Sequence, residues 1–90
     1  MIEFTAVLAD FNNSLWGNYL PVEREIAEQV LEGHSDRRVI CTINDTVDFQ
    51  CALMPKGDGN YYILVNKANK KKARIQLGQE VRVSLSKDES

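Results

Sequence analysis

The stretch Gly59-Asn60-Tyr61-Tyr62-Ile63-Leu64-Val65 decides the fold, because parts of it and of its surroundings occur twice. Gly17-Asn18-Tyr19 stands 42 residues before Gly59-Asn60-Tyr61. Self-similarity at a fixed spacing indicates an internal repeat. Apolar positions recur at the same offset, and a second match lies upstream at an offset of 45: Val22 with Leu64, Val39 with Val81, Cys41 with Val83, Ile43 with Leu85, and Phe4-Thr5-Ala6-Val7-Leu8 with Phe49-Gln50-Cys51-Ala52-Leu53. We therefore interpret residues 1–45 and 46–86 as two half-repeats.

Each half has the pattern of two strands, a helix and a third strand. Alternating apolar residues predict the strands, and an apolar stripe at helical spacing predicts the longer helix. Pro21 suits the first turn of that helix, since its missing N–H would have no partner there. Asn66 is a suitable N-cap for the shorter helix. The predicted strands are residues 1–9, 15–20, 38–43, 47–54, 60–65 and 81–85, and the predicted helices are residues 22–31 and 67–74.

These elements predict a mainly β fold with two helices. Neither half covers its own apolar face, so the halves should pack on each other in a single domain of residues 1–90. We expect a six-stranded small barrel or pseudo-barrel of two ββα-β half-repeats, capped by the helices, because closure removes exposed strand edges. Side chains already fill the interior of an eight-stranded barrel, and a six-stranded barrel is narrower. A ligand should therefore bind outside, at a loop or between a helix and the barrel mouth.

Glycines and core positions along nearly the whole chain form a recognisable set of motifs: Phe4-x-Ala6, Leu20-Pro21-Val22, Val39-x-Cys41-x-Ile43-Asn44 with Phe49 and Leu53, Gly59-x-Tyr61-x-Ile63-x-Val65, and Ile75-x-x-Gly78-x-x-Val81. This set resembles the bacterial DUF1905 family of small β-barrel domains of unknown function. Gln79 departs from the family pattern, in which an acidic residue follows the glycine. The resemblance implies no catalytic residue in this chain. In some members of the family, this domain is fused to a second domain of the YdeI or OmpD-associated type. The last motif is also distantly similar to the swapped-hairpin barrels of the AbrB and MazE type, and such a likeness of fold is a poor guide to function.

The charge of the chain is unevenly spread. Its net charge is −2, but residues 1–45 hold three Arg and eight acids, whereas residues 46–90 hold eight Lys or Arg and five acids. No apolar run approaches the ~18 residues of a membrane span. The first residues lack a basic segment followed by an apolar one, as a secretion signal would have. We expect a cytoplasmic protein that does not enter a membrane.

The residues with reactive side chains do not indicate an enzyme. Cys41 and Cys51 lie on the inward phase of their strands, which favours two small buried residues in a reducing cytosol over a redox pair. His34 is followed by Ser35 and Asp36, but adjacency in sequence is not triad geometry, so we favour a surface histidine. No spacing fits a metal site. We therefore expect no catalytic residues, no metal ligands and no cofactor.

The sharpest functional feature is the basic run at residues 67–74. Such a cluster attracts phosphates and acidic groups, although a solvated face that keeps the protein soluble is the alternative interpretation. Trp16, beside the loop at residues 10–14, would stack a base or anchor a peptide if it were exposed. The predicted interaction surface consists of Lys67, Lys70, Lys71, Lys72, Arg74 and Trp16.

We predict a non-catalytic binding or interaction module of the bacterial cytoplasm. Its partner would be an unknown protein or an acidic ligand, and a monomer is favoured. Weak nucleic-acid binding through residues 67–74 is the alternative, against which the net charge of −2 argues. A subunit or accessory domain of an enzyme system is the second alternative.

Overall fold

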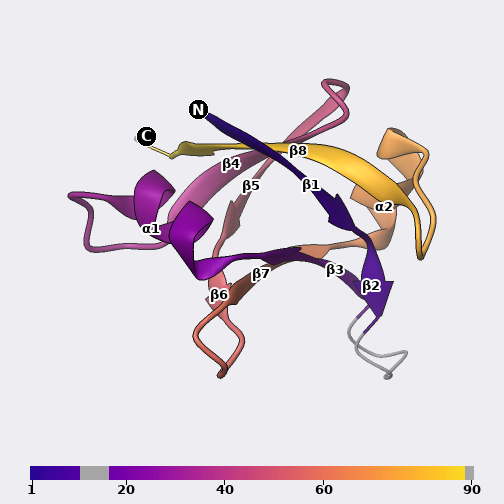
Figure 1. Ribbon diagram of the computed structural model, residues 1–90. Helices are drawn as coiled ribbons and strands as arrows, with labels where there is room; N and C mark the ends of the chain where they lie inside the picture. The colour runs from indigo at the N-terminus through magenta and orange to yellow at the C-terminus, as the bar shows by residue number, and fades with distance from the viewer. Residues whose placement is uncertain (11–16, 89–90) are drawn as a thin grey trace.

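The fold is known from a computed structural model, which describes residues 1–10 and 17–88. Within these residues, eight strands form two antiparallel four-stranded sheets, and two helices lie at opposite sides of them (Figure 1). The mainly β fold with two helices is therefore confirmed. In chain order the elements are β1 (Ile2–Val7), β2 (Ala9–Asp10), β3 (Asn18–Val22), α1 (Arg24–Leu31), β4 (Arg38–Ile43), β5 (Val47–Ala52), β6 (Met54–Pro55), β7 (Tyr61–Val65), α2 (Lys67–Ala73) and β8 (Glu80–Lys87).

Two corners join the sheets, whose strand orders are β1-β8-β4-β5 and β2-β3-β7-β6. Only Leu8 separates β1 from β2, and only Leu53 separates β5 from β6. At these residues the chain leaves one sheet and enters the other, so two of the six predicted strands are each split in two. The sheets do not close into a barrel, because no ladder joins β1 to β3 or β5 to β7 among the described residues. Of the predicted small barrel or pseudo-barrel, the closed form is absent from the part of the chain that the structure describes, and the small, mainly β fold is confirmed.

The two halves have the same order of main elements, and their ladders have matching registers. In the first sheet β1 pairs with β8 so that Ile2 lies opposite Leu85, and β5 pairs with β4 so that Val47 lies opposite Ile43. Adding 45 to the residue numbers of β1 gives those of β5, and subtracting 42 from those of β8 gives those of β4. The two ladders therefore have equivalent registers. The corner residues also match: Leu8 N donates to Gln79 O at 3.0 Å, and Leu53 N donates to Arg37 O at 2.9 Å.

One hydrophobic core lies between the sheets, and the inward phase of every long strand supplies it. Leucine, isoleucine, valine and Cys41 side chains from both sheets are almost completely excluded from solvent, as the alternating patterns predict. The described helices are too short and too polar to cross a membrane. The side chains with 0% exposure, apart from Ala27 of α1, are Leu20, Val39, Cys41, Ile43, Leu53, Ile63, Val83 and Leu85.

The start of α1 differs from the sequence prediction. Pro21 and Val22 belong to β3, where they pair with Tyr62 and Tyr61, and the helix begins only at Arg24. Pairing with β7 over the whole strand outweighs the suitability of proline for a first helical turn. The N-terminus of α2 follows the prediction, because Asn66 Oδ1 accepts a hydrogen bond from Asn69 N at 2.8 Å.

Candidate functional site

An open edge lies between β1 and β3. β1 is the last strand of its sheet, and β2 pairs with β3 only at Asn18 and Tyr19, so residues 20–22 of β3 have no strand on that side. β1 lies next to β3 without a ladder between them among the described residues. Pro21 has no N–H, and proline occurs in strands where its nitrogen faces away from the ladder. Since β7 pairs with β3 through Pro21, this residue offers no backbone N–H to a strand on the side of β1.

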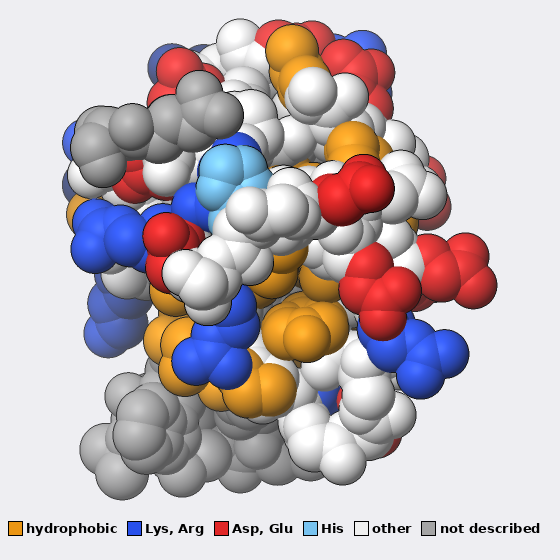
Figure 2. Space-filling model, turned by 90° about the vertical axis from the view of Figure 1, so that its left-hand side faces the viewer, with side chains coloured by type: hydrophobic (Ala, Val, Ile, Leu, Met, Phe, Trp, Pro, Cys, Tyr) orange, Lys and Arg blue, Asp and Glu red, His pale blue; other side chains and the backbone are white. Residues whose placement is uncertain are grey.

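A hollow of about 340 Å³ occupies this open edge. Its volume lies at the lower end of the ~300–1,000 Å³ that is usual for small-molecule sites. On the side of the molecule that carries α1, hydrophobic side chains reach the surface next to acidic and basic ones (Figure 2). The apolar lining of the hollow consists of Phe4, Ala6, Pro21, Val22, Ile26 and Tyr61, and the polar lining consists of Thr5, Glu23, Lys56 and Asn60.

Asn60 ties the loop between β6 and β7 to the start of α1. Its Oδ1 accepts a hydrogen bond from Arg24 N at 3.1 Å, and so replaces a side-chain cap from Glu23, which makes none. The backbone of Asn60 is itself held, because its N–H donates to Asp58 Oδ1 at 2.9 Å and its carbonyl accepts from Lys56 N at 2.9 Å. These bonds fix the mouth of the hollow, where Glu23 and Lys56 lie.

Lys56 contacts a pair of aromatic rings through Tyr19. Its ammonium lies 5.3 Å from the centroid of the Tyr19 ring, a distance at which the face of the ring attracts a cation. The Tyr19 ring in turn meets Tyr62 edge to face, with centroids 5.7 Å apart and an interplanar angle of 69°. The three residues come from three separate segments, so this cluster holds the β6–β7 loop against β3.

The corresponding edge in the second half, between β5 and β7, has α2 beside it. Pro21 of β3 corresponds to Ile63 of β7, and Ile26 of α1 corresponds to Ala68 of α2, at the offset of 42 residues. The main strand contact of α2 is β5, whereas that of α1 is β8. α2 therefore lies beside the edge of the second half that corresponds to the open edge of the first, and α1 leaves its own edge open.

The cations predicted as an interaction surface lie on or next to α2. Lys70 is half-buried, and its Nζ donates to Asn18 Oδ1 at 3.0 Å. Lys67 and Lys70 line a smaller hollow of about 150 Å³ together with Asp10, Gly17, Asn18 and Val65. Lys71, Lys72 and Arg74 are exposed. Trp16 lies outside the described residues, so the prediction that it joins this surface stays a prediction.

The two cysteines have the environment of inert core residues. Cys41 is buried and Cys51 is half-buried, and both are free thiols. Burial raises the pKa of Cys41, with smaller contributions from Cys51 and Asp48. Burial alone raises the pKa of Cys51 to about 12. A thiol is reactive as its thiolate, so neither residue is activated at neutral pH.

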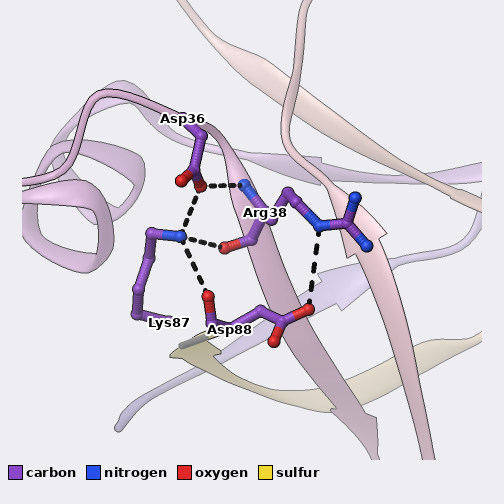
Figure 3. Close-up of polar contacts among 4 residues, drawn as sticks. All are labelled: Asp36, Arg38, Lys87 and Asp88. Carbon is purple, nitrogen blue, oxygen red and sulfur yellow. Dashed lines mark hydrogen bonds and ion pairs between the residues drawn. The ribbon is translucent and has the colours of Figure 1, made fainter. Parts of the chain in front are cut away.

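His34, Ser35 and Asp36 form no catalytic triad. All three are exposed, and Asp36 instead binds Lys87, which lies at the end of β8 (Figure 3). The hydrogen bond from Lys87 lowers the pKa of Asp36, and a bond from Arg38 N at 3.0 Å acts in the same direction.

Lys87 joins the end of β8 to the segment that precedes β4. Besides Asp36, its Nζ donates to Arg38 O at 2.8 Å and to Asp88 O at 3.2 Å, and Arg38 Nε lies 3.8 Å from Asp88 Oδ2 (Figure 3). The side chains of Lys87 and Asp88 are only 8% and 2% exposed. The cluster therefore fastens the described C-terminal end of the chain. In residues 1–10 and 17–88, no three His, Cys, Asp or Glu side chains are grouped as metal ligands would be.

One comparison with known proteins gives a match. The family model described as "Domain of unknown function (DUF1905)" matches residues 4–85, which is nearly the whole chain. The resemblance inferred from the motifs is thereby confirmed. No curated protein matches the chain.

Proposed function

Because the chain belongs to the DUF1905 family, a domain of unknown function, we propose its function from the open edge: the protein is a non-catalytic module that binds a small molecule in the hollow between β1 and β3. The ligand has an apolar body, which contacts Phe4, Ile26 and Tyr61. Its polar groups meet Thr5, Glu23, Lys56 or Asn60 at the mouth.

The observation that carries this proposal is the hollow at the unpaired edge between β1 and β3, which Pro21 helps to line. Apolar surface next to a few convergent polar groups is the usual composition of a ligand site. The mouth is also held in place before any ligand binds, because Asn60 joins the β6–β7 loop to α1. A site that needs little ordering loses less affinity to conformational entropy.

The composition of the lining favours binding over catalysis. Among the described residues that line the hollow there is no histidine, the commonest general base, and no cysteine or serine nucleophile. His34 and the two cysteines lie elsewhere. These facts support a module that holds its ligand without changing it.

We also propose the cytoplasm of a bacterium as the setting, and an internal duplication as the origin of the two halves. The two free cysteines support a reducing compartment. The matching registers of β1·β8 and β4·β5, with the offsets of 45 and 42 residues, support the duplication.

Filling the hollow with a large side chain tests the binding proposal. Thr5→Trp places an indole in the hollow from an exposed position of β1, and Gln50→Trp is the matched control at the corresponding exposed position of β5. The probe is anilinonaphthalene sulfonate, which has an aromatic body and one negative charge. Two-dimensional amide NMR should show shifts of Phe4, Asn60 and Tyr61 in the wild type and in Gln50→Trp.

We expect Thr5→Trp to weaken binding of the probe by about tenfold or more, which corresponds to ~1.4 kcal/mol. Thermal melts of both variants check that each remains folded. Shifts confined to other residues, or equal affinity of Thr5→Trp and wild type, would show that the hollow is not the site.

A further inference from the structure

The two helices carry opposite charges at corresponding positions. α1 and α2 follow the second strand of their respective halves, and the offset between them is 42 residues. At this offset three glutamates of the first helical segment correspond to three cations of the second: Glu25 to Lys67, Glu28 to Lys70, and Glu32 to Arg74. The two halves thus share the order of their elements, but the corresponding helical faces carry opposite charges.

Each set forms a stripe along its helix. Side chains three and four residues apart lie on the same face of a helix, and both sets have that spacing. Glu25, Glu28, Glu32, Lys67 and Arg74 are all exposed. Lys71, four residues after Lys67, adds one more exposed cation to the basic stripe, and the exposed Lys72 lies on another face of the helix.

The basic stripe has no acidic partner among residues 1–10 and 17–88. Only Lys70 is bonded to a side chain, and that partner is the neutral amide of Asn18. The acidic stripe has one weak contact, from Arg24 Nε to Glu28 at 3.9 Å, between side chains that are about two-thirds exposed. The four ion pairs of the described residues are Arg24–Glu28, Arg38–Asp88, Arg82–Asp45 and Lys87–Asp36.

One molecule cannot bring its own two stripes together, because α1 and α2 lie at opposite sides of the sheets (Figure 1). Two molecules can do so. The stripes have the same spacing along helices of similar length, so each glutamate of one copy can lie opposite a cation of another.

We propose that the protein associates head to tail with a second copy of itself, through the acidic stripe of α1 and the basic stripe of α2. Such a contact uses two different surfaces, so it produces a ring or an open chain rather than a closed dimer. Helices of seven and eight residues are only about 10–12 Å long. The contact therefore lies in the small class of interfaces, below ~1,200 Å², which are weak.

The conformation of Arg74 supports a use for its charge. Arg74 has φ 57° and ψ 44°, a left-handed conformation that disfavours residues with a side chain. The segment after α1 uses Gly33, with φ 79°, for its left-handed residue. An arginine in place of glycine after α2 adds a cation at the end of the basic stripe despite the strain.

Charge reversal tests the proposal, with sedimentation velocity over a wide range of protein concentrations in low salt. One variant reverses α1 (Glu25→Lys, Glu28→Lys, Glu32→Lys). The other reverses α2 (Lys67→Glu, Lys71→Glu, Arg74→Glu) and spares Lys70, which binds Asn18. The wild type should associate, each variant alone should remain monomeric, and an equimolar mixture of the two should associate again.

Salt and position provide the controls. Association of the wild type should disappear near 0.5 M salt, where the screening length falls to about 4–5 Å. Glu3→Lys with Asp48→Lys changes exposed acids on strands and should leave association unchanged. Circular dichroism verifies the fold of each variant.

Three outcomes overturn the proposal. They are a wild type that is monomeric at every concentration in low salt, single-helix variants that associate as the wild type does, and a mixture that stays monomeric. A gel-shift assay with a mixed-sequence oligonucleotide tests whether the partner is nucleic acid rather than a second copy of the protein. Salt-sensitive binding of the oligonucleotide by a monomeric wild type, lost in the α2 variant, would assign the basic stripe to nucleic acid instead.

Discussion

Replacing Arg74 by glycine should make the protein more stable. The helix α2 ends in a Schellman-type motif, in which Ile75 N donates to Lys70 O at 3.3 Å and Arg74 N donates to Lys71 O at 3.2 Å. Ile75 is only 3% exposed. Because Ile75 must enter the core directly after the helix, the residue before it is held in the left-handed region.

The magnitude follows from two opposing terms. The left-handed conformation costs a residue with a Cβ about 1–2 kcal/mol, and glycine loses ~0.5–1 kcal/mol more backbone entropy on folding. Arg74 is exposed, so its side chain contributes little burial. We expect Arg74→Gly to raise the free energy of unfolding by about 0.5–1 kcal/mol, which for a domain of this size raises Tm by ~2–8 °C.

Urea titration followed by circular dichroism measures the effect, and two controls separate backbone strain from charge. Arg74→Gln removes the charge but keeps the strain, so it should change stability by less than about 0.5 kcal/mol. Gly33→Arg makes the reverse change after α1, where nothing lies within 4 Å of an added Cβ, and should destabilise by ~1 kcal/mol. An unchanged or lower urea midpoint in Arg74→Gly, or equal gains in Arg74→Gly and Arg74→Gln, would refute the strain argument.

Two further predictions concern ionisable groups away from both proposed surfaces. Since burial raises the pKa of Cys51 to about 12, a thiol reagent should label the native protein slowly at neutral pH and quickly in urea; fast native labelling would show that this thiol is open to solvent. The bond from Lys87 lowers the pKa of Asp36. Ionised Asp36 therefore stabilises the folded protein above the unfolded pKa of ~3.9, and this stabilisation disappears as the pH falls through the lower pKa of the folded state. Asp36→Asn should therefore reduce stability at neutral pH and leave the variant and the wild type equally stable at the most acidic pH, and parallel pH profiles would contradict this.

Local periodicity was sufficient to predict the elements of the fold. The strands β4 and β7 and the helix α2 lie within one residue of their predicted bounds, because alternation and an N-cap are local signals. The corners at Leu8 and Leu53 could not be predicted in this way. Both residues keep the inward phase of their strands and are buried, so nothing in the alternation marks the change of sheet.

The site was harder to predict than the fold, because its residues come together only through long-range packing. Thr5, Glu23, Lys56 and Asn60 come from three separate segments, because Lys56 and Asn60 share the β6–β7 loop, and each is an ordinary polar residue in its local context. Pro21 was the available signal. The helical spacing after it predicts a first helical turn there, whereas proline in a strand indicates an edge position.

Comparison of the two halves offers a way to separate structural from functional residues in this chain. Where corresponding positions serve the same packing, as Val39 and Val81 do, both are buried and apolar. Pro21 against Ile63 distinguishes the edge that carries the hollow from the edge beside α2, and Glu25 against Lys67 distinguishes the two stripes. Since both halves must satisfy the same backbone pairing, the fold alone does not require these differences. A substitution that makes one half resemble the other, such as Pro21→Ile, should therefore remove a function and preserve the fold. We expect this variant, in which a branched side chain replaces the proline ring that lines the hollow, to weaken binding of the anilinonaphthalene sulfonate probe by about tenfold. A folded Pro21→Ile variant with wild-type affinity for the probe would show that the proline does not shape the site.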